Sequence, residues 1–425
     1  MNRQQGHRGH HLLAADRRFV TGGGILARLT ARGLHKLLDR IDRGLVAGSI
    51  EVTLPDGTAR LLGGRQRGPA ARVRLHSWRA LVRLATSGSV GWYKAWTLGE
   101  WTSADPVRLF ELFMRNGDAL GEAGRASGFA KWKNRIAHAV RSNDRRGARR
   151  NIAFHYDLGN DFYGAWLDPS MTYSSARFAE PISESEPLED AQARKIRTLL
   201  DRLDLKPGDR LLEIGCGWGS LAEIAARDYG VRLTGLTLST EQKAYAEARL
   251  RDAGVADKAA IALCDYRDVE GSFDAVASVE MVEAVGQEYW PSYLHTIARV
   301  LKPGGKAALQ LISMRESLFE GYAANADFIQ TYIFPGGLLI SEARFRAIAE
   351  AAGLEWCDRT GFALHYAETL KRWRVRYDLA VAEQRLPKGF DEAFHNLWRY
   401  YLMYCEGGFR GGGIDVVQVT LKKSG

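Results

Sequence analysis

Several features that would place this chain in a common class are missing from its sequence. The four cysteines (Cys216, Cys264, Cys357 and Cys405) are scattered with no Cys-x-x-Cys spacing, which argues against a zinc site and a disulfide framework, so we expect no metal. No apolar run reaches the roughly 18 residues of a membrane-spanning helix. The polar start of the chain lacks the pattern of a signal peptide. These absences favour a protein of the reducing cytoplasm.

Charge is abundant in the chain and is unevenly distributed. Its 425 residues suffice for two domains, and 46% hydrophobic and 26% charged residues are ordinary for a globular protein. The first 150 residues carry 28 Lys and Arg against 11 Asp and Glu, whereas the rest carry 31 against 39. This asymmetry indicates that the amino-terminal part meets a polyanion, for which anionic phospholipid and nucleic acid are both candidates.

Composition divides the chain into four segments. Residues 1–23 are polar and rich in His and Gly, and we expect them to be disordered. Residues 24–140 are expected to form a basic α+β domain, and the basic, glycine-interrupted residues 141–150 a linker. Residues 151–425 form the second domain.

Three features mark the amino-terminal domain. Apolar residues recur at three- and four-residue intervals over residues 24–45, which predicts a basic amphipathic helix that either lies on a membrane or packs on its own domain. A hairpin is expected over residues 49–62, around the turn Pro55-Asp-Gly57. The aromatic stretch 92–101 predicts either a membrane-facing or interdomain patch or, as the more usual alternative, core packing.

The most informative stretch is an apolar run that breaks into a glycine-rich turn, Leu211-Leu-Glu-Ile-Gly-Cys-Gly-Trp-Gly219. A buried strand that ends in Gly215-x-Gly217-x-Gly219 and is followed by a helix creates a nucleotide-shaped pocket at the strand's carboxyl end. The glycines let the backbone approach a ligand closely. On its own, this motif serves NAD, FAD and S-adenosylmethionine alike.

The residues after the next two strands distinguish among these cofactors. The strand at 231–235 is followed by hydroxyl and amide groups, at Thr237 and Gln242, and Glu241 is the only acid where a dinucleotide enzyme binds ribose. The strand at 260–264 ends in an acid and an aromatic ring where an adenine would lie, Asp265 and Tyr266.

The remaining strands complete a recognisable order. Strands are expected at 273–279 and, after Lys302-Pro-Gly-Gly305, at 306–312, and residues 411–421 suit a last antiparallel strand. The pattern predicts an α/β protein of the class I S-adenosylmethionine methyltransferase fold, with a Rossmann-like seven-stranded sheet whose last strand is antiparallel, plus the smaller α+β amino-terminal domain. An NAD enzyme is the weaker interpretation.

Further motifs in the same order resemble the cyclopropane-fatty-acyl-phospholipid synthase family. The similarity is strong over about residues 150–421 and looser in the amino-terminal domain. It is carried by His155-Tyr-Asp-Leu-Gly-Asn-Asp161, Leu167-Asp-Pro169, Met171-Thr-Tyr-Ser174, Glu213-Ile-Gly-Cys-Gly-Trp-Gly219, Asp265-Tyr-Arg-Asp268, Tyr332-Ile-Phe-Pro335, Gly361-Phe-Ala-Leu-His-Tyr366 and Tyr400-Tyr-Leu-Met-Tyr-Cys405.

The resemblance implies that residues 151–425 are a catalytic domain that adds a methylene unit, derived from the methyl of S-adenosylmethionine, across a cis double bond of a phospholipid acyl chain. An isolated alkene is a poor nucleophile, so it must be held in line with the sulfonium methyl. Methyl transfer leaves a carbocation, which needs a dry site and aromatic faces. A base, a bound bicarbonate ion in the family, then removes a proton so that the ring closes.

The resemblance also assigns site residues. Those of the cofactor are Tyr173, Ser174, Gly215, Gly217, Thr237, Leu238, Gln242, Asp265 and Tyr266. Those of the catalytic anion site are Glu283, Tyr366, Gln310, Ile312 and Ser175. For some of these side chains an ordinary structural role is the alternative: a packed aromatic for Tyr266, a helix-start acid for Glu283 and a buried, backbone-bonded tyrosine for Tyr366.

Two positions depart from the family pattern. The family typically has cysteine where this chain has Ser175, a modest change if the backbone amide contacts the anion. It has histidine where this chain has Gln310, which matters more because an amide can hydrogen-bond but cannot carry charge or shuttle a proton. Gln310 could hold bicarbonate through its NH₂ group, or mark a variant that ends the same cation as a methyl or methylene branch.

The leading hypothesis is therefore a peripheral enzyme on the cytoplasmic face of the membrane. Its basic domain would dock on anionic phospholipid and admit an unsaturated acyl chain to the site. Methylation of a soluble molecule's nitrogen or oxygen is an alternative that leaves the basic domain without a role. A nucleic-acid-binding protein is a further alternative, although no nucleic-acid motif occurs and we expect no such partner. A homodimer is left open.

Overall fold

The computed structural model describes residues 8–13, 31–121, 158–325 and 327–425. The expected linker, 141–150, lies outside these residues. Within the expected disordered tail, His10–Leu13 forms the short helix α1, and Leu12 is fully buried. Order therefore begins earlier than predicted there, because one apolar side chain finds a place in the core.

The described chain divides into two compact units that are interleaved along the sequence. The first comprises Met1–Ser142, Arg315–Pro335 and Lys388–Ile414, and the second comprises Asn143–Met314, Gly336–Pro387 and Asp415–Gly425. This division differs from the sequence-based one, 24–140 and 151–425, because two segments of the carboxy-terminal half pack with the amino-terminal residues.

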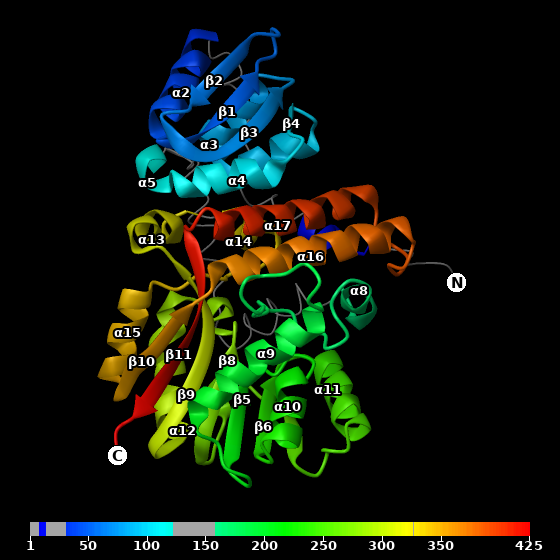
Figure 1. Cartoon of the computed structure of the whole chain (residues 1–425), viewed down its shortest axis with the longest axis vertical. Helices are drawn as coiled ribbons and strands as arrows, with labels where there is room; N and C mark the ends of the chain where they lie inside the picture. The colour runs from blue at the N-terminus through cyan, green and yellow to red at the C-terminus, as the bar shows by residue number, and fades with distance from the viewer. Residues whose placement is uncertain (1–7, 14–30, 122–157, 326) are drawn as a thin grey trace. The chain divides into compact units, whose positions relative to one another are not determined.

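The first unit is an α+β assembly (Figure 1, where its sheet is blue). Among the described residues its strands form a four-stranded sheet in the order β2-β1-β3-β4, with β1 antiparallel to β2 and parallel to β3, so the hairpin predicted at 49–62 is confirmed. The elements are α1, α2 (Ala31–Gly44), β1 (Ala47–Thr53), β2 (Ala59–Gly63), β3 (Gln66–Leu75), α3 (Arg79–Thr97), β4 (Trp101–Thr102), α4 (Pro106–Arg115), α5 (Gly117–Leu120), α13 (Glu316–Ala323), α14 (Phe328–Tyr332) and α17 (Glu392–Arg410).

The predicted amphipathic helix packs on its own unit. Its described part is α2, whose apolar residues Leu34, Leu38 and Ile41 are spaced by four and three positions and are all buried, as is Leu45 just after the helix. This apolar face contacts β2, α3 and α5. Of the two interpretations, packing on the domain is the one confirmed for these residues, and residues 24–30 lie outside the described ranges.

Aromatic packing explains why distant segments join this unit. Trp92 and Trp101 stack with their ring centroids 4.4 Å apart, and both are buried. Tyr93 lies among Phe328, Tyr332 and Tyr400, with centroid distances of 4.9, 4.8 and 4.9 Å. The aromatic stretch 92–101 is therefore core, and its partners on α14 and α17 could not be found by local patterns because they lie more than 200 positions away.

The second unit has the predicted methyltransferase fold. Among the described residues, its strands form a seven-stranded sheet in the order β10-β11-β9-β8-β5-β6-β7. Numbered within the sheet from β5, this order is 6-7-5-4-1-2-3. Strands β7, β6, β5, β8 and β9 are parallel to one another in that succession, and β10 is antiparallel to β11. The class I S-adenosylmethionine methyltransferase topology expected from the sequence is confirmed.

The strands expected from the sequence are present, although β9 begins at Leu301 and so includes Lys302-Pro-Gly-Gly305, which was expected to precede it. Figure 1 shows the arrangement of the elements. The elements are α8 (Asn160–Gly164), α9 (Leu188–Leu200), η4 (Asp201–Leu203), β5 (Arg210–Ile214), α10 (Ser220–Asp228), β6 (Arg232–Thr237), α11 (Thr240–Asp252), β7 (Ala259–Leu263), η5 (Tyr266–Asp268), β8 (Phe273–Val279), η6 (Val282–Ala284), η7 (Gln287–Tyr289), α12 (Trp290–Val300), β9 (Leu301–Met314), α15 (Glu342–Ala351), β10 (Leu354–Gly361), α16 (Ala363–Ala382) and β11 (Ile414–Lys423).

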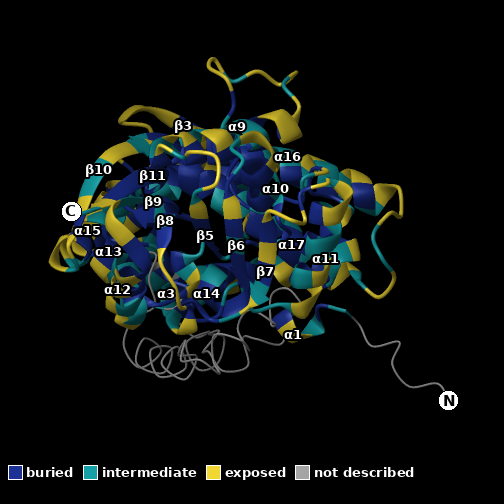
Figure 2. Cartoon of the chain, turned by 90° about the horizontal axis from the view of Figure 1, so that it is seen from below, coloured by how far each residue is buried: buried dark blue, intermediate teal, exposed yellow. Residues whose placement is uncertain are grey.

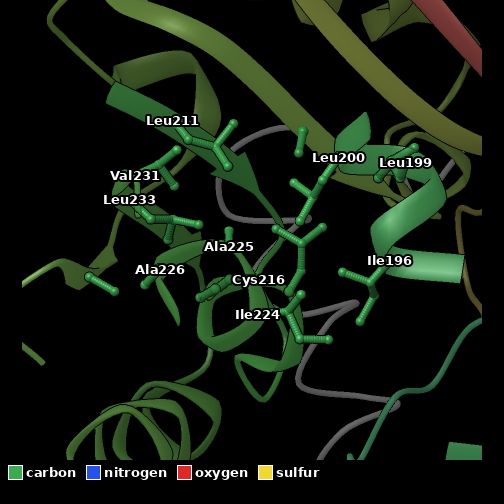
Figure 3. Close-up of a cluster of buried hydrophobic side chains, with 14 of the residues drawn as sticks. Ile196, Leu199, Leu200, Leu211, Cys216, Ile224, Ala225, Ala226, Val231 and Leu233 are labelled. Carbon is green, nitrogen blue, oxygen red and sulfur yellow. The ribbon is translucent and has the colours of Figure 1, made fainter. Parts of the chain in front are cut away.

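Helices cover both faces of this sheet, which is why its central strands are nearly continuous apolar runs. On one face, α9 and α10 pack on β5 and β6 through a cluster that includes Leu199, Leu211 and Ile224 (Figure 3). Around Phe345 of α15, the rings of Trp290 and Tyr293 from α12 lie 5.7 and 6.4 Å away. In Figure 2, buried residues follow the central strands β5, β8 and β9. The rigid sheet fixes the loops at its carboxyl edge, where the site lies.

Two features are missing from the residues that the structure describes. No helix there is both long and apolar enough to cross a bilayer. The described residues also contain no cluster of three or more His, Cys, Asp or Glu side chains that could bind a metal ion.

Candidate active site

The glycine-rich turn after β5 has the backbone that a close-fitting ligand needs. Gly215, Gly217 and Gly219 have φ angles of 83°, 50° and 84°, a left-handed region that side chains other than glycine rarely adopt. A Cβ on Gly217 would meet nothing within 4 Å, so open space lies beside this turn. Helix α10 begins at the next residue, Ser220, and presents its N-terminus there.

The end of β6 supplies polar groups that are fixed to each other. The Thr237 hydroxyl donates to Oε1 of Gln242 at 2.9 Å, and both side chains are buried. Because Oε1 accepts this bond, the amide nitrogen of Gln242 remains to donate a hydrogen bond to a ligand. Leu238 is half-buried beside them. The structure thus places all three predicted residues at one strand end.

The third strand ends in the predicted acid and ring. Asp265 is buried, and both of its carboxylate oxygens accept hydrogen bonds from Arg267, at 2.8 and 2.7 Å. Tyr266 packs edge-on against Tyr293 with the centroids 5.5 Å apart, and burial raises the pKa of its hydroxyl to about 12. Arg267, which sequence reasoning did not select, therefore orients the acid that was predicted to meet the adenine.

Tyr173 and Ser174 are the remaining predicted cofactor residues; Ser174 is buried and accepts a hydrogen bond from Lys195, and an aromatic group surrounds Tyr173. Its ring centroid lies 5.2 Å from that of Trp373, 5.3 Å from that of Tyr163 and 5.7 Å from that of Trp166. Tyr366 continues the group, 6.1 Å from Trp373. Aromatic faces attract cations, so the group suits a sulfonium ion or a carbocation. The signal in the sequence was the spacing of aromatic residues along α16, which the prediction did not use.

Glu280, which the sequence-based prediction did not select, accepts hydrogen bonds from three residues of the predicted anion site. Oε1 of Glu280 accepts hydrogen bonds from the Ser175 backbone amide at 2.9 Å and from Nε2 of Gln310 at 2.7 Å. Oε2 accepts from the Tyr366 hydroxyl at 2.7 Å. The groups expected to hold an external anion therefore hold this carboxylate.

The backbone at Glu280 shows that its placement is unusual. Its φ is 48°, in the left-handed region that favours glycine. Such a conformation costs free energy at a non-glycine residue, and surrounding structure must hold it. The hydrogen bonds to the carboxylate supply that support. The signal in the sequence was an acid directly after strand β8, only three positions before the Glu283 that was chosen.

Glu283 lies near Glu280 but takes no part in these hydrogen bonds. Its Oε1 accepts a hydrogen bond from the Ile312 backbone amide, so these two predicted residues do meet. Its Oε2 is buried and has no hydrogen-bond partner among the residues that the structure describes. Burial, reinforced by the charge of Glu280, raises the pKa of the Glu283 carboxyl to about 8. At neutral pH it is therefore mainly the neutral acid.

The two departures from the family pattern now have structural roles. The Ser175 hydroxyl donates to the Ala176 carbonyl, so this side chain is used locally while its backbone amide serves the site. Gln310 donates to Glu280, and its Oε1 accepts from Nε2 of Gln418 on β11 at 3.0 Å. An amide suits this position because it must donate at one end and accept at the other.

The fold, the glycine turn and the polar strand ends together define an S-adenosylmethionine-dependent methyltransferase. The sequence profile described as "Mycolic acid cyclopropane synthetase" matches residues 143–419, and the chain belongs to that family. It is 38% identical over 412 residues to tuberculostearic acid methyltransferase UfaA1 of Mycobacterium tuberculosis, covering 95% of this chain and 93% of that protein.

Two further comparisons agree with this assignment. The cyclopropane-fatty-acyl-phospholipid synthase of Escherichia coli is 37% identical over 272 residues, which are 63% of this chain and 66% of that protein. The structure of mycolic acid cyclopropane synthase CmaA1 with SAH and CTAB is similar with a TM-score of 0.60 and 30% identity, covering 65% of this chain and 98% of that one. The chain is thus an S-adenosylmethionine-dependent enzyme of this family.

Proposed function

We propose that the protein transfers one carbon from S-adenosylmethionine to a cis double bond in a phospholipid acyl chain and that Glu280 is the base that ends the reaction. The observation that carries the proposal is the convergence of Ser175, Gln310 and Tyr366 on the Glu280 carboxylate. These are the groups to which the family resemblance assigns bicarbonate. A carboxylate supplied by the chain would make a bound anion unnecessary.

S-adenosylmethionine supplies an electrophilic methyl group when bound. The strand-end groups Thr237, Gln242 and Asp265 would hold it, and the aromatic group around Tyr173 would face the positive charge. The alkene would give its π electrons to the methyl carbon as the bond from that carbon to sulfur breaks and S-adenosylhomocysteine leaves, so the neighbouring alkene carbon would become cationic. Buried aromatic side chains exclude the water that would otherwise trap this cation.

The position of the cation at the moment when Glu280 removes a proton then decides which product forms. If a proton leaves the new methyl group while the cation is on the neighbouring carbon, a three-membered ring closes. If a hydride first shifts and brings the cation to the methyl-bearing carbon, loss of the same proton gives a methylene branch. In both cases Glu280 gains the proton and the lipid gains one CH₂ unit, so the two products have the same mass.

We place the methylene branch first, because two observations support it. UfaA1, a relative that is similar over nearly the whole chain, is named a methyltransferase, whereas the similarity to the cyclopropane synthase of Escherichia coli covers 63% of this chain. Gln310 stands where the synthases typically carry histidine. A saturated methyl branch would in addition need a hydride donor and hence a separate reductase.

Ring formation is the second candidate, supported by the similarity to the structure of cyclopropane synthase CmaA1. To distinguish the two, the full chain is incubated with S-adenosylmethionine and vesicles of cis-unsaturated phosphatidylglycerol. The acyl products are then analysed by mass spectrometry before and after mild hydrogenation. A methylene branch takes up hydrogen and shows vinylidene protons, whereas a ring does neither. No added carbon in any acyl chain would refute lipid methylation.

We further propose that the first unit docks on anionic phospholipid at the cytoplasmic face of the membrane. On β3, burial alternates strictly from Pro69 onward, so that Arg72 and Arg74 lie on the exposed face of the sheet. Leu61, paired across β1 with this row, is 67% exposed. Glu51 lies between Leu61 and Arg72 and forms an ion pair with Arg72, with 3.0 Å between Oε2 and Nε. The exposed Arg74 and the protruding Leu61 on this face support docking on a surface of anionic headgroups.

A further inference from the structure

A buried lysine contacts the cofactor loop, residues 172–175, which carries the predicted cofactor residues Tyr173 and Ser174. Lys195 on α9 is fully buried, and its Nζ donates to the hydroxyl of Ser174 at 2.5 Å. One turn earlier on the same face, the buried Gln192 donates to the carbonyl oxygens of Thr172 and Ser174, at 3.3 and 2.9 Å. Helix α9 therefore holds the loop that carries Tyr173 and Ser174 with one charged and one neutral side chain.

A buried ammonium is costly unless negative charge lies near it. The carboxyls that act on Lys195 are those of Glu280, Asp168 and Glu213, and burial lowers the pKa of the lysine to about 8, so it is mainly charged at neutral pH. Burial raises the pKa of Glu213 to about 8, which leaves that group mainly neutral. Asp168 accepts from Ser170 and is also influenced by Arg376.

Glu280 is therefore the carboxylate whose ionisation depends most on Lys195. Burial raises its pKa, Lys195 is the largest opposing influence, and Tyr366, Ser175 and Gln310 also oppose the rise. The neighbouring Glu283, mainly neutral, adds little negative charge. Without a nearby cation, a carboxyl at this depth would hold its proton and could not accept another.

Hydrogen bonds join the two residues through a route whose polarity is fixed. Nε2 of Gln418 donates to the Lys195 backbone carbonyl at 3.2 Å and to Oε1 of Gln310 at 3.0 Å. The carbonyl can only accept, so the nitrogen of Gln418 must face it, and Gln310 must turn its own nitrogen to the Glu280 carboxylate. A second route passes from Ser174 to the Ser175 amide, which donates to Glu280.

We infer that Lys195 is a positioning residue that supplies the positive charge keeping Glu280 ionised while it fixes Ser174 of the cofactor loop. One side chain thereby sets both the methyl donor and the base. This inference rests on the proposed function, because it gives Glu280 the role of base. It adds that the charge of Glu280 depends on a residue that touches neither substrate nor reacting atoms.

The test compares Lys195→Met and Lys195→Gln with Gln192→Met, a matched control that removes loop hydrogen bonds without removing charge. All three are expected to raise KM for S-adenosylmethionine several-fold. Loss of the cation raises the pKa of Glu280, so in both Lys195 variants the acid limb of the pH profile of kcat/KM moves to higher pH, by about one unit. In Gln192→Met it stays at the wild-type position.

An unmoved acid limb in the Lys195 variants, or an equal shift in Gln192→Met, overturns the inference. If the Lys195 variants do not fold, an infrared difference spectrum between wild type and Glu280→Gln at neutral pH decides. An ionised carboxylate band assigned to Glu280 is expected, and a protonated carboxyl band contradicts the inference. This spectrum needs no turnover, so a failure of the inference is distinguishable from a failure of lipid methylation.

Discussion

The Tyr366 hydroxyl on α16 donates to Oε2 of Glu280, directly after β8, with 2.7 Å between the oxygens. This bond joins a residue that the sequence pointed to with one that it did not. It orients the carboxylate and stabilises its ionised form, which is the form that can take a proton.

Tyr366→Phe tests that bond. Loss of a hydrogen bond to a charged group costs about 1.5–3 kcal/mol, so kcat is expected to fall roughly 10- to 100-fold. Binding of S-adenosylmethionine, measured by calorimetry, stays within about twofold because the ring remains beside Trp373. Tyr245→Phe on α11 is the control and keeps wild-type activity. An unchanged kcat in Tyr366→Phe would remove this tyrosine from the site.

Glu283→Gln tests the neutral state of the second carboxyl. Burial raises the folded-state pKa of Glu283 from 4.5 to about 8. The folded state therefore holds a proton that the unfolded state releases, and stability that is present below pH 4.5 is lost as pH rises towards 8. The uncharged amide avoids this loss, so the variant should melt a few degrees above wild type near pH 8.

The melting temperatures of Glu283→Gln and wild type should converge near pH 4.5, measured by calorimetry across this range. The exposed Glu288 on the same segment provides the control, since Glu288→Gln should leave the difference near zero at every pH. A variant that is less stable than wild type at pH 8 would show that Glu283 is charged in the fold.

Arg72→Gln/Arg74→Gln tests membrane docking by the first unit. An arginine near an anionic surface contributes about 1 kcal/mol, so the double variant should bind phosphatidylglycerol vesicles roughly 30-fold more weakly in sedimentation. Arg232→Gln/Arg251→Gln, which removes two exposed arginines of the second unit, is the control. Equal losses in both variants would mean that net charge, and not this sheet face, governs binding.

The sequence was sufficient for the fold of the second unit because its signals are local. The strand at 211–214 is a short apolar run, and the glycines after it are required by left-handed φ angles. The same holds for the strand-end groups Thr237 and Asp265. These residues can be recognised in the sequence by their type and spacing, and in the structure each lies at the expected edge of the sheet.

The site beyond the cofactor was only partly predictable, because its key contacts join distant residues. Ser175 and Glu280 lie 105 positions apart, and Gln310 and Gln418 lie 108 apart. The resemblance named the donors but gave them a free anion as partner. No periodicity reveals that Glu280 turns its side chain to those donors, since that depends on the positive φ at its own backbone.

The central claim, that Glu280 replaces a free anion as the base, is tested most directly by the turnover of Glu280→Gly with and without added bicarbonate. Glycine suits the φ of 48° and leaves the Ser175 amide, Gln310 and Tyr366 without their acceptor. We predict that turnover on cis-unsaturated vesicles falls at least about 100-fold in bicarbonate-free buffer and is partly restored by bicarbonate, while wild type is indifferent to it. Near-wild-type turnover of Glu280→Gly without bicarbonate, or a wild-type enzyme that needs the ion, would contradict the account.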